Sequence, residues 1–145
     1  MFLKNKCIAR GVAVVTVALF SFAVSAMDKS PVPDGAKVYI VSPASGDTVT
    51  SPVTVVFGLT GMGVAPAGVD KEHTGHHHLI IDAPLPDLDV PIPSDDNHKH
   101  FGKGQTETTI ELTPGKHTLQ LLLGNHLHIP HETAVSSAVI EITVE

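Results

Sequence analysis

The spacing of the apolar residues constrains the fold of this chain most strongly, because after residue 36 they recur at every second position. Val53, Val55 and Phe57 alternate with other side chains in one segment, and residues 117–123 repeat the pattern with leucine. Successive side chains of a strand point to opposite faces of a sheet, so a period of two predicts half-buried strands. The chain also has 11 prolines, all after residue 30, and proline is rarely tolerated inside a helix. We therefore expect an all-β fold.

The alternating segments are separated by turn sequences, of which Ser45-Gly46-Asp47 and Pro114-Gly115 are examples. About seven short strands in one domain are typical of an immunoglobulin-like or fibronectin-like antiparallel β-sandwich. We expect this domain to span residues 37–145 and to follow a flexible tether at 27–36, which contains Pro and Gly. The predicted strands are 37–42, 53–60, 76–82, 106–113, 116–124 and 136–144, and a seventh, irregular strand is left open within 83–105.

The N-terminus is built differently from the rest of the chain. Three cationic residues precede an apolar run from Gly11 to Val24, and the small residues Ser25 and Ala26 follow it. This order predicts a secretory signal peptide at residues 1–26. The apolar run is shorter than the roughly 20 residues that a membrane-spanning helix needs. We expect the mature protein to be periplasmic or secreted, with no stable membrane span after cleavage.

Removal of the signal peptide changes the composition in two ways that exclude whole classes of function. The only cysteine, Cys7, is lost, so the mature chain can form no disulfide, no thiolate zinc site and no blue-copper centre. Loss of three cations changes the formal charge from −6 to −9. A net-acidic domain is not expected to bind nucleic acid, which favours basic surfaces.

Nine of the ten histidines fall into three groups, and this is the most informative feature for function. His76 and His78 are expected on one face of the strand at 76–82, with His77 on the other face. The tenth, His117, shares a predicted strand face with leucines and is interpreted as structural. The groups are His73 with His76, His77 and His78; His98 with His100; and His126 with His128 and His131.

Strands of a sandwich run alternately up and down, so the three loops that carry these groups are expected to meet at one end. Neutral imidazole suits Zn(II), Cu(II) and Ni(II), with Cu(II) bound most tightly. Six candidates exceed the three or four protein ligands of one zinc ion, so either some support the ligands or two ions bind. We predict a copper or zinc site with ligands drawn from His76, His78, His98, His100, His128 and His131.

Other residues near these groups have more than one interpretation. Asp82, Asp95 and Asp96 are either ligands or acceptors that fix an imidazole tautomer, and Asp95 and Asp96 have a further interpretation as turn residues. Met62 lies in a Gly-rich stretch, where a thioether either favours Cu(I) or packs against the core. The roles of His73, His77 and His126 stay open.

Five sequence runs point, in order, to a known family. They are GMGVAPAG (61–68), TGHHHLIID (74–82), PIPSDDNHKHFGKGQTET (91–108), PGKHTLQLLLG (114–124) and HIPH (128–131). Together they resemble a bacterial family of small exported proteins known as domain of unknown function 4399. The similarity covers about residues 37–145 and implies a compact exported β domain with His-rich motifs, but no established activity. The chain departs from the family pattern at residues 125–127, where Asp-x-Asn is more usual, so His126 is the least secure member of its group.

Three classes of function are compatible with these features. The first is a periplasmic protein that binds or buffers copper or zinc, and it is the one we adopt. The second is a non-catalytic envelope module that binds a protein or polysaccharide, which sandwich folds commonly do. The third is a copper- or zinc-dependent redox enzyme, which would need an open coordination position. No catalytic residue is assigned, since no nucleophile-elbow motif is present.

Overall fold

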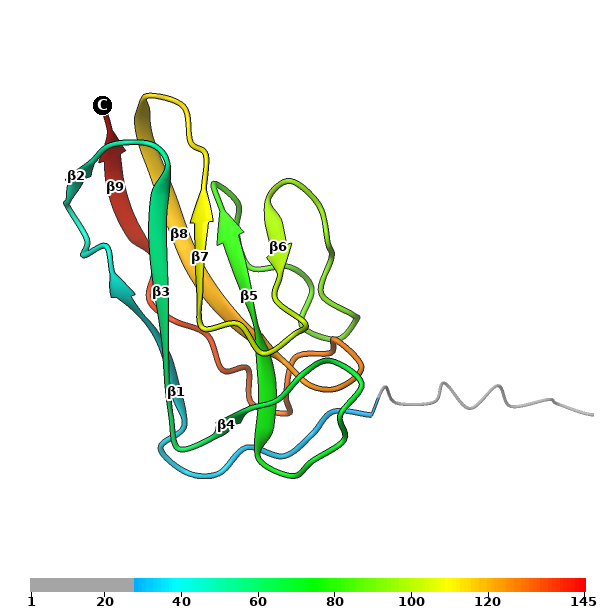
Figure 1. Cartoon of the computed structure of the whole chain (residues 1–145). Coiled ribbons are helices and arrows are strands. Elements are labelled where there is room, and N and C mark those ends of the chain that lie inside the picture. Colours follow the sequence, from blue (N-terminus) through cyan, green and yellow to red (C-terminus); the bar gives the residue numbers. More distant parts are fainter. Residues whose placement is uncertain (1–27) are drawn as a thin grey trace, which may run out of the picture.

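The computed structural model describes residues 28–145, so the predicted signal peptide at 1–26 lies outside the described residues. Within this range the chain forms nine strands and no helix (Figure 1). The strands are β1 (Lys37–Ser42), β2 (Thr48–Val49), β3 (Val53–Thr60), β4 (Gly63–Val64), β5 (Thr74–Ile81), β6 (His98–His100), β7 (Glu107–Ile110), β8 (Gly115–Gly124) and β9 (Ile140–Val144).

The strands form two sheets that pack as a β-sandwich, which confirms the predicted fold class. One sheet has the order β1-β3-β7, and the other has the order β2-β9-β8-β5-β4 with β6 paired to β5 (Figure 1). The longer pairings are antiparallel, and only the two-residue strands β2 and β4 pair in parallel, with β9 and β5. The finer immunoglobulin-like or fibronectin-like assignment stays a prediction.

The core lies between the inner faces of the two sheets. Val55 of β3, Leu79 of β5 and Leu121 of β8 are fully buried there, and Ile142 of β9 joins them. Burial of an aliphatic side chain of this size stabilises the fold by about 1.5–3 kcal/mol. The alternating positions that predicted strands are therefore the positions that hold the sheets together.

A second, smaller apolar cluster covers the outer face of the larger sheet. Ile80 of β5 and Leu122 of β8 point to this face, and Ile92 from the β5–β6 connection packs on them. A hydrogen bond also fixes the connection to the end of β5, because Asn97 Nδ2 donates to the carbonyl oxygen of Ile81 at 2.8 Å. The outer face of β5 is thus covered, which lets polar residues on it be buried.

The segment 83–105, left open by the sequence, contains the short strand β6 beside β5. The last strand starts later than predicted, because residues before Ile140 meet β8 through single bonds rather than a ladder: Leu123 N donates to Val135 O, and Leu121 N donates to Ser137 Oγ. The two-residue strands escaped prediction because two residues show no alternation. Across residues 28–145, no helix has the length and apolar character that crossing a membrane requires.

Candidate metal centre

The alternation of β5 separates its three consecutive histidines. His76 and His78 point to the outer face of the larger sheet, which they share with Ile80. His77 points to the inner face, where its ring lies 5.1 Å from the ring of Phe57. All three are at most 1% exposed.

Two neighbouring segments bring one histidine each to the same outer face. His100 of β6 pairs directly with His78 of β5, so the two side chains lie side by side. His128 comes from the loop after β8, which ends at Gly124, and Gly124 is the partner of His76 on β5. The strand register therefore gathers histidines from three distant parts of the sequence.

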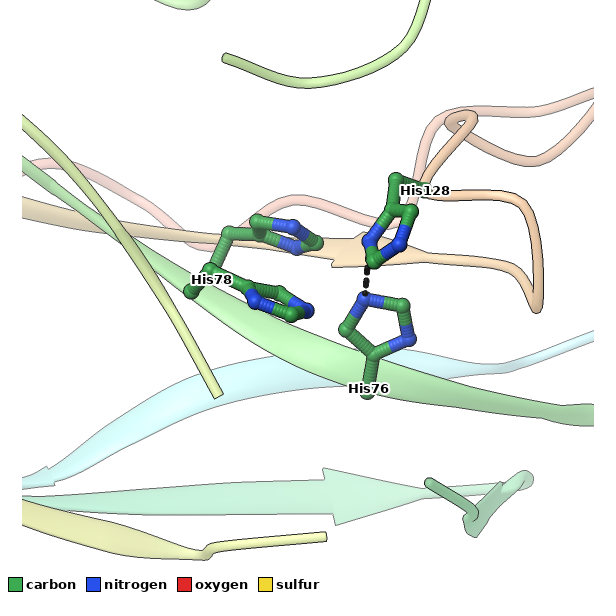
Figure 2. A group of neighbouring side chains, drawn as sticks. His76, His78 and His128 are labelled. Atoms are coloured by element: carbon green, nitrogen blue, oxygen red, sulfur yellow. Dashed lines mark hydrogen bonds between the residues drawn. The ribbon is translucent and has the colours of Figure 1, made fainter. Parts of the chain in front are cut away.

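The four side chains form a compact group. One ring nitrogen from each of His76, His78, His100 and His128 lies within 4.8 Å of the others. His76 Nε2 and His128 Nδ1 are 3.2 Å apart, and Figure 2 shows these two rings facing each other beside His78. Metal–nitrogen bonds are about 2 Å long, so nitrogens that share an ion must lie within about 4 Å. Small side-chain adjustments suffice to bring all four nitrogens onto one ion.

Several nitrogens in the group have no hydrogen-bond partner within residues 28–145. His76 Nδ1, His78 Nδ1 and His100 Nε2 are all buried in this state. Leaving a buried polar atom unpaired costs about 1–3 kcal/mol, so native proteins seldom do it without reason. A metal ion takes the lone pair of one imidazole nitrogen from each ring, so it would satisfy at most one nitrogen of each histidine.

The surroundings of His76, His78 and His100 keep these three imidazoles neutral. Burial, helped by the nearby imidazoles, lowers the pKa of His76 from its ordinary 6.5 to about 3 and that of His78 to about 2. Burial and His128 also lower the pKa of His100. Only the neutral ring has a free lone pair, so these side chains are ready to bind a metal at neutral pH.

Two glycines make room for the rings. A β-carbon added at Gly102 would lie 2.4 Å from His100 Cε1 and 2.5 Å from His100 Nε2. One added at Gly124 would lie 2.8 Å from His78 Cε1. Non-bonded carbon atoms rest at about 3.5–4.0 Å, so any larger residue would displace the histidine. Sequence reasoning missed both positions, although Gly102 follows His100 by only two residues.

His128 is held by its loop in an unusual backbone conformation, with a φ of 64°. The buried side chain of Asn125 organises this loop: its Oδ1 accepts the backbone N–H groups of Leu127 at 2.9 Å and Ile129 at 3.1 Å. The carbonyl oxygen of His128 accepts the N–H of Ile92 at 2.8 Å, which joins the loop to the β5–β6 connection. These bonds stabilise a left-handed conformation that ordinarily costs about 1–3 kcal/mol.

The first described residues contact the same loops. Asn125 Nδ2 donates to the carbonyl oxygen of Asp28 at 2.9 Å and is 3.2 Å from Ser30 Oγ. Lys29 pairs with Asp89 of the β5–β6 connection. The segment after the predicted cleavage site thus lies against both loops near the histidine group.

Two of the six predicted ligands lie outside the group of four. His98 on β6 pairs with Ile80, and its Nδ1 donates to Asp95 Oδ1 at 2.8 Å. His131 Nε2 is 3.2 Å from the carbonyl oxygen of Thr74, and its Nδ1 is buried with no partner found in the described part of the chain. Asp95 also accepts the N–H of His98, so it acts both as a turn residue and as an imidazole partner.

The other histidines have different neighbours. His77 Nδ1 is 3.3 Å from the carbonyl oxygen of Gln105, and His126 Nδ1 is 3.5 Å from a carboxylate oxygen of Asp70. His73 is half-exposed beside Glu72. Met62 packs against the inner core, which favours the packing interpretation of that residue.

His117 and Asp82 form a separate pair at the opposite end of β5 and β8. His117 Nδ1 lies 2.6 Å from Asp82 Oδ2, and its Nε2 lies 2.8 Å from the carbonyl oxygen of Thr113. Both partners are acceptors, and the hydrogen bond to Asp82 raises the pKa of His117 above its ordinary value. The structural role predicted for His117 agrees with these contacts, and Asp82 is engaged away from the four-histidine group.

The fold and this site define a class: a β-sandwich with a buried four-histidine group that could hold a metal ion. The family model described as "Domain of unknown function (DUF4399)" matches residues 55–145, and the chain belongs to this family. No curated protein and no solved structure matches the chain. The family description assigns no activity, so the function has to be argued from the site.

Proposed function

We propose that this chain is an exported protein that binds one copper or zinc ion through His76, His78, His100 and His128. The observation that carries the proposal is the convergence of four ring nitrogens within 4.8 Å of one another, on a buried face and from three separate segments. Satisfied structural histidines have hydrogen-bond partners for their nitrogens, as His117 does. In this group His76 Nδ1, His78 Nδ1 and His100 Nε2 instead have no such partner in the described residues.

The donor set supports a borderline divalent ion. Four neutral imidazoles match the ligand number of a zinc site, and Cu(II) is held more tightly than Zn(II) by the same nitrogens. Hard ions such as Mg²⁺ and Ca²⁺ require oxygen ligands, which the group does not offer. His98 and His131 are not needed as ligands in this arrangement.

The proposed location rests on the N-terminal sequence alone. A cationic start, a short apolar run and small residues before Met27 are typical of a secretory signal. The mature chain would then fold outside the cytoplasm without any thiol of its own, and its imidazoles would be its principal donors for a borderline ion.

Isothermal titration of the untagged mature chain with Cu(II) and with Zn(II) tests the proposal. We expect one ion per chain, and we expect His100→Ala and His128→Ala each to weaken binding by at least about tenfold, since each removes a ligand. His126→Ala is the matched control, because His126 lies in the same loop as His128 but outside the group. Equal metal affinity in the wild type and the three variants would show that these histidines do not form the binding site.

The same preparation separates this proposal from a metal-free interaction module. A metal that binds only the folded state raises the melting temperature, and the increase is larger when the metal binds more tightly. Protein purified without metal, whose melting temperature stays unchanged when copper or zinc is added, would favour the module that binds a protein or polysaccharide.

A further inference from the structure

The four ligands of the proposed site are all uncharged, and this has a chemical consequence. No carboxylate belongs to the group of donors found within residues 28–145. A divalent ion held only by neutral imidazoles keeps its full double positive charge. The surroundings do not offset this charge, since His76 and His78 sit beside an apolar cluster that contains Ile80 and Leu122.

Acidic residues near the site in the sequence are engaged elsewhere. Asp95 and Asp96, which precede β6, interact with His98 and Lys99. Asp82, which follows β5, pairs with His117 at the other end of the sheet. The chain itself therefore brings no negative charge into the ligand group.

The two sides of the group differ in burial. His76 and His78 are fully buried against the sheet, whereas His100 and His128 are partly exposed. Figure 2 shows His128 approaching the pair on β5 from the side of its loop. An ion held by all four would therefore lie nearer to solvent on the side of His100 and His128 than on the side of the sheet.

We propose that the copper-loaded centre binds a small monoanion, such as hydroxide or azide, as a further ligand on this solvent side. The inference rests on the proposed function, because it requires the metal. Cu(II) favours tetragonal coordination, which leaves a position beyond four nitrogens, whereas Zn(II) is typically satisfied by four ligands. An uncompensated charge beside an apolar surface is costly, and an anion at that position offsets it.

Azide titration of the copper-loaded mature chain tests the inference. We expect a saturable azide-to-copper charge-transfer band and a matching change in the copper paramagnetic resonance spectrum, while copper remains bound after gel filtration. Unchanged spectra in a large excess of azide would overturn the inference and leave the metal site intact. Failure of the chain to bind copper would overturn both.

A charge-bearing variant tests the electrostatic reason. His100→Glu exchanges one neutral ligand for a carboxylate, so we expect the copper affinity to change and the azide affinity, measured at saturating copper, to fall by about tenfold or more. Leu127→Glu adds the same charge at an exposed position of the loop that carries His128, outside the group, and should change azide affinity by less than about threefold, because an exposed charge is screened. Equal azide affinity in the wild type and His100→Glu would contradict the charge argument.

Discussion

Histidine side chains have opposite surroundings at the two ends of the paired strands β5 and β8. At one end both nitrogens of His117 face oxygen acceptors, and the pKa of this histidine is raised. At the other end His76 and His78 face other imidazoles and apolar residues, and their pKa values are lowered far below 6.5. The first environment stabilises an imidazolium, and the second stabilises a free lone pair. The atoms around the ring nitrogens therefore decide whether a histidine of these strands is suited to a structural role or to binding a metal.

The largest expected effect is on the stability of the four-histidine end. A ligand that binds only the folded state at about 1,000 times its Kd adds about 4 kcal/mol to the free energy of unfolding. We expect Cu(II) or Zn(II) to raise the melting temperature in thermal unfolding and a chelator to reverse the change. His117→Gln should show the same metal-induced increase as the wild type. Loss of that increase in His117→Gln would show that the two ends are not independent.

The second prediction concerns the pH dependence of the metal-free protein. In the unfolded chain His76 and His78 take up protons near pH 6.5, whereas in the folded chain they resist protonation down to about 3 and about 2. Their neutral forms therefore contribute stability that is fully present above pH 6.5 and is lost as pH falls below it. Denaturant unfolding should show a loss on the order of 1 kcal/mol per histidine per pH unit below pH 6.5.

A variant that cannot titrate sharpens this prediction. His78→Leu is similar in volume but carries no proton, so the loss of stability below pH 6.5 should be smaller by the share of one histidine, on the order of 1 kcal/mol per pH unit. His126→Ala should keep the wild-type dependence, because His126 lies outside the group. A metal-free stability that is flat between about pH 6.5 and about pH 5 would contradict the low pKa values.

A smaller effect is expected from the glycines that make room for the rings. Gly102→Ala should move His100 and weaken metal binding by about tenfold, comparable to the loss of a supporting contact. Gly124→Ala should do the same through His78 and also cost about 1–3 kcal/mol, because that ring is buried. Gly63→Ala is the matched control, since its β-carbon would approach only Thr74 Cγ2, at 3.4 Å. Isothermal titration and thermal melting measure both quantities.

The smallest effect is expected at the His117 end. The pKa of His117 is raised by Asp82, so the pair contributes stability below pH 6.5 that is lost as pH rises through the folded-state pKa. Asp82→Asn should lower the free energy of unfolding by no more than about 1 kcal/mol near pH 6, because Asp82 is partly exposed. Metal affinity should not change. A large drop in affinity would show that this pair supports the metal site.

The sequence predicted the strands well, because alternation reports directly which face of a sheet a residue occupies. For the same reason it placed His76 and His78 together and His77 apart. It could not choose between His98 and His100, which share a face of β6. That choice depends on the register that sets His100 opposite His78, and register comes from contacts between distant segments.

The loop after β8 shows a second limit of sequence reasoning. The sequence pattern did not distinguish His128 from His131 as a ligand, but only His128 belongs to the group. Its position depends on the hydrogen bonds of Asn125 and on the bond from Ile92, a residue 36 positions earlier. Such non-local bonds leave no periodic mark in the sequence. The glycines escaped prediction similarly, because close approach is visible only once the strands are paired.

Because three histidines follow one another in β5, the site depends on whether the length of this strand changes by an odd or an even number of residues. Deletion of one residue early in β5, or insertion of one, would exchange the two faces of the strand, so that His77 would point outward and His76 and His78 would point into the core. Changes of two residues would preserve the faces and only displace the site along the sheet. Relatives of this chain should therefore accept length changes in β5 only in even steps, whereas the loops on either side are free of this restriction.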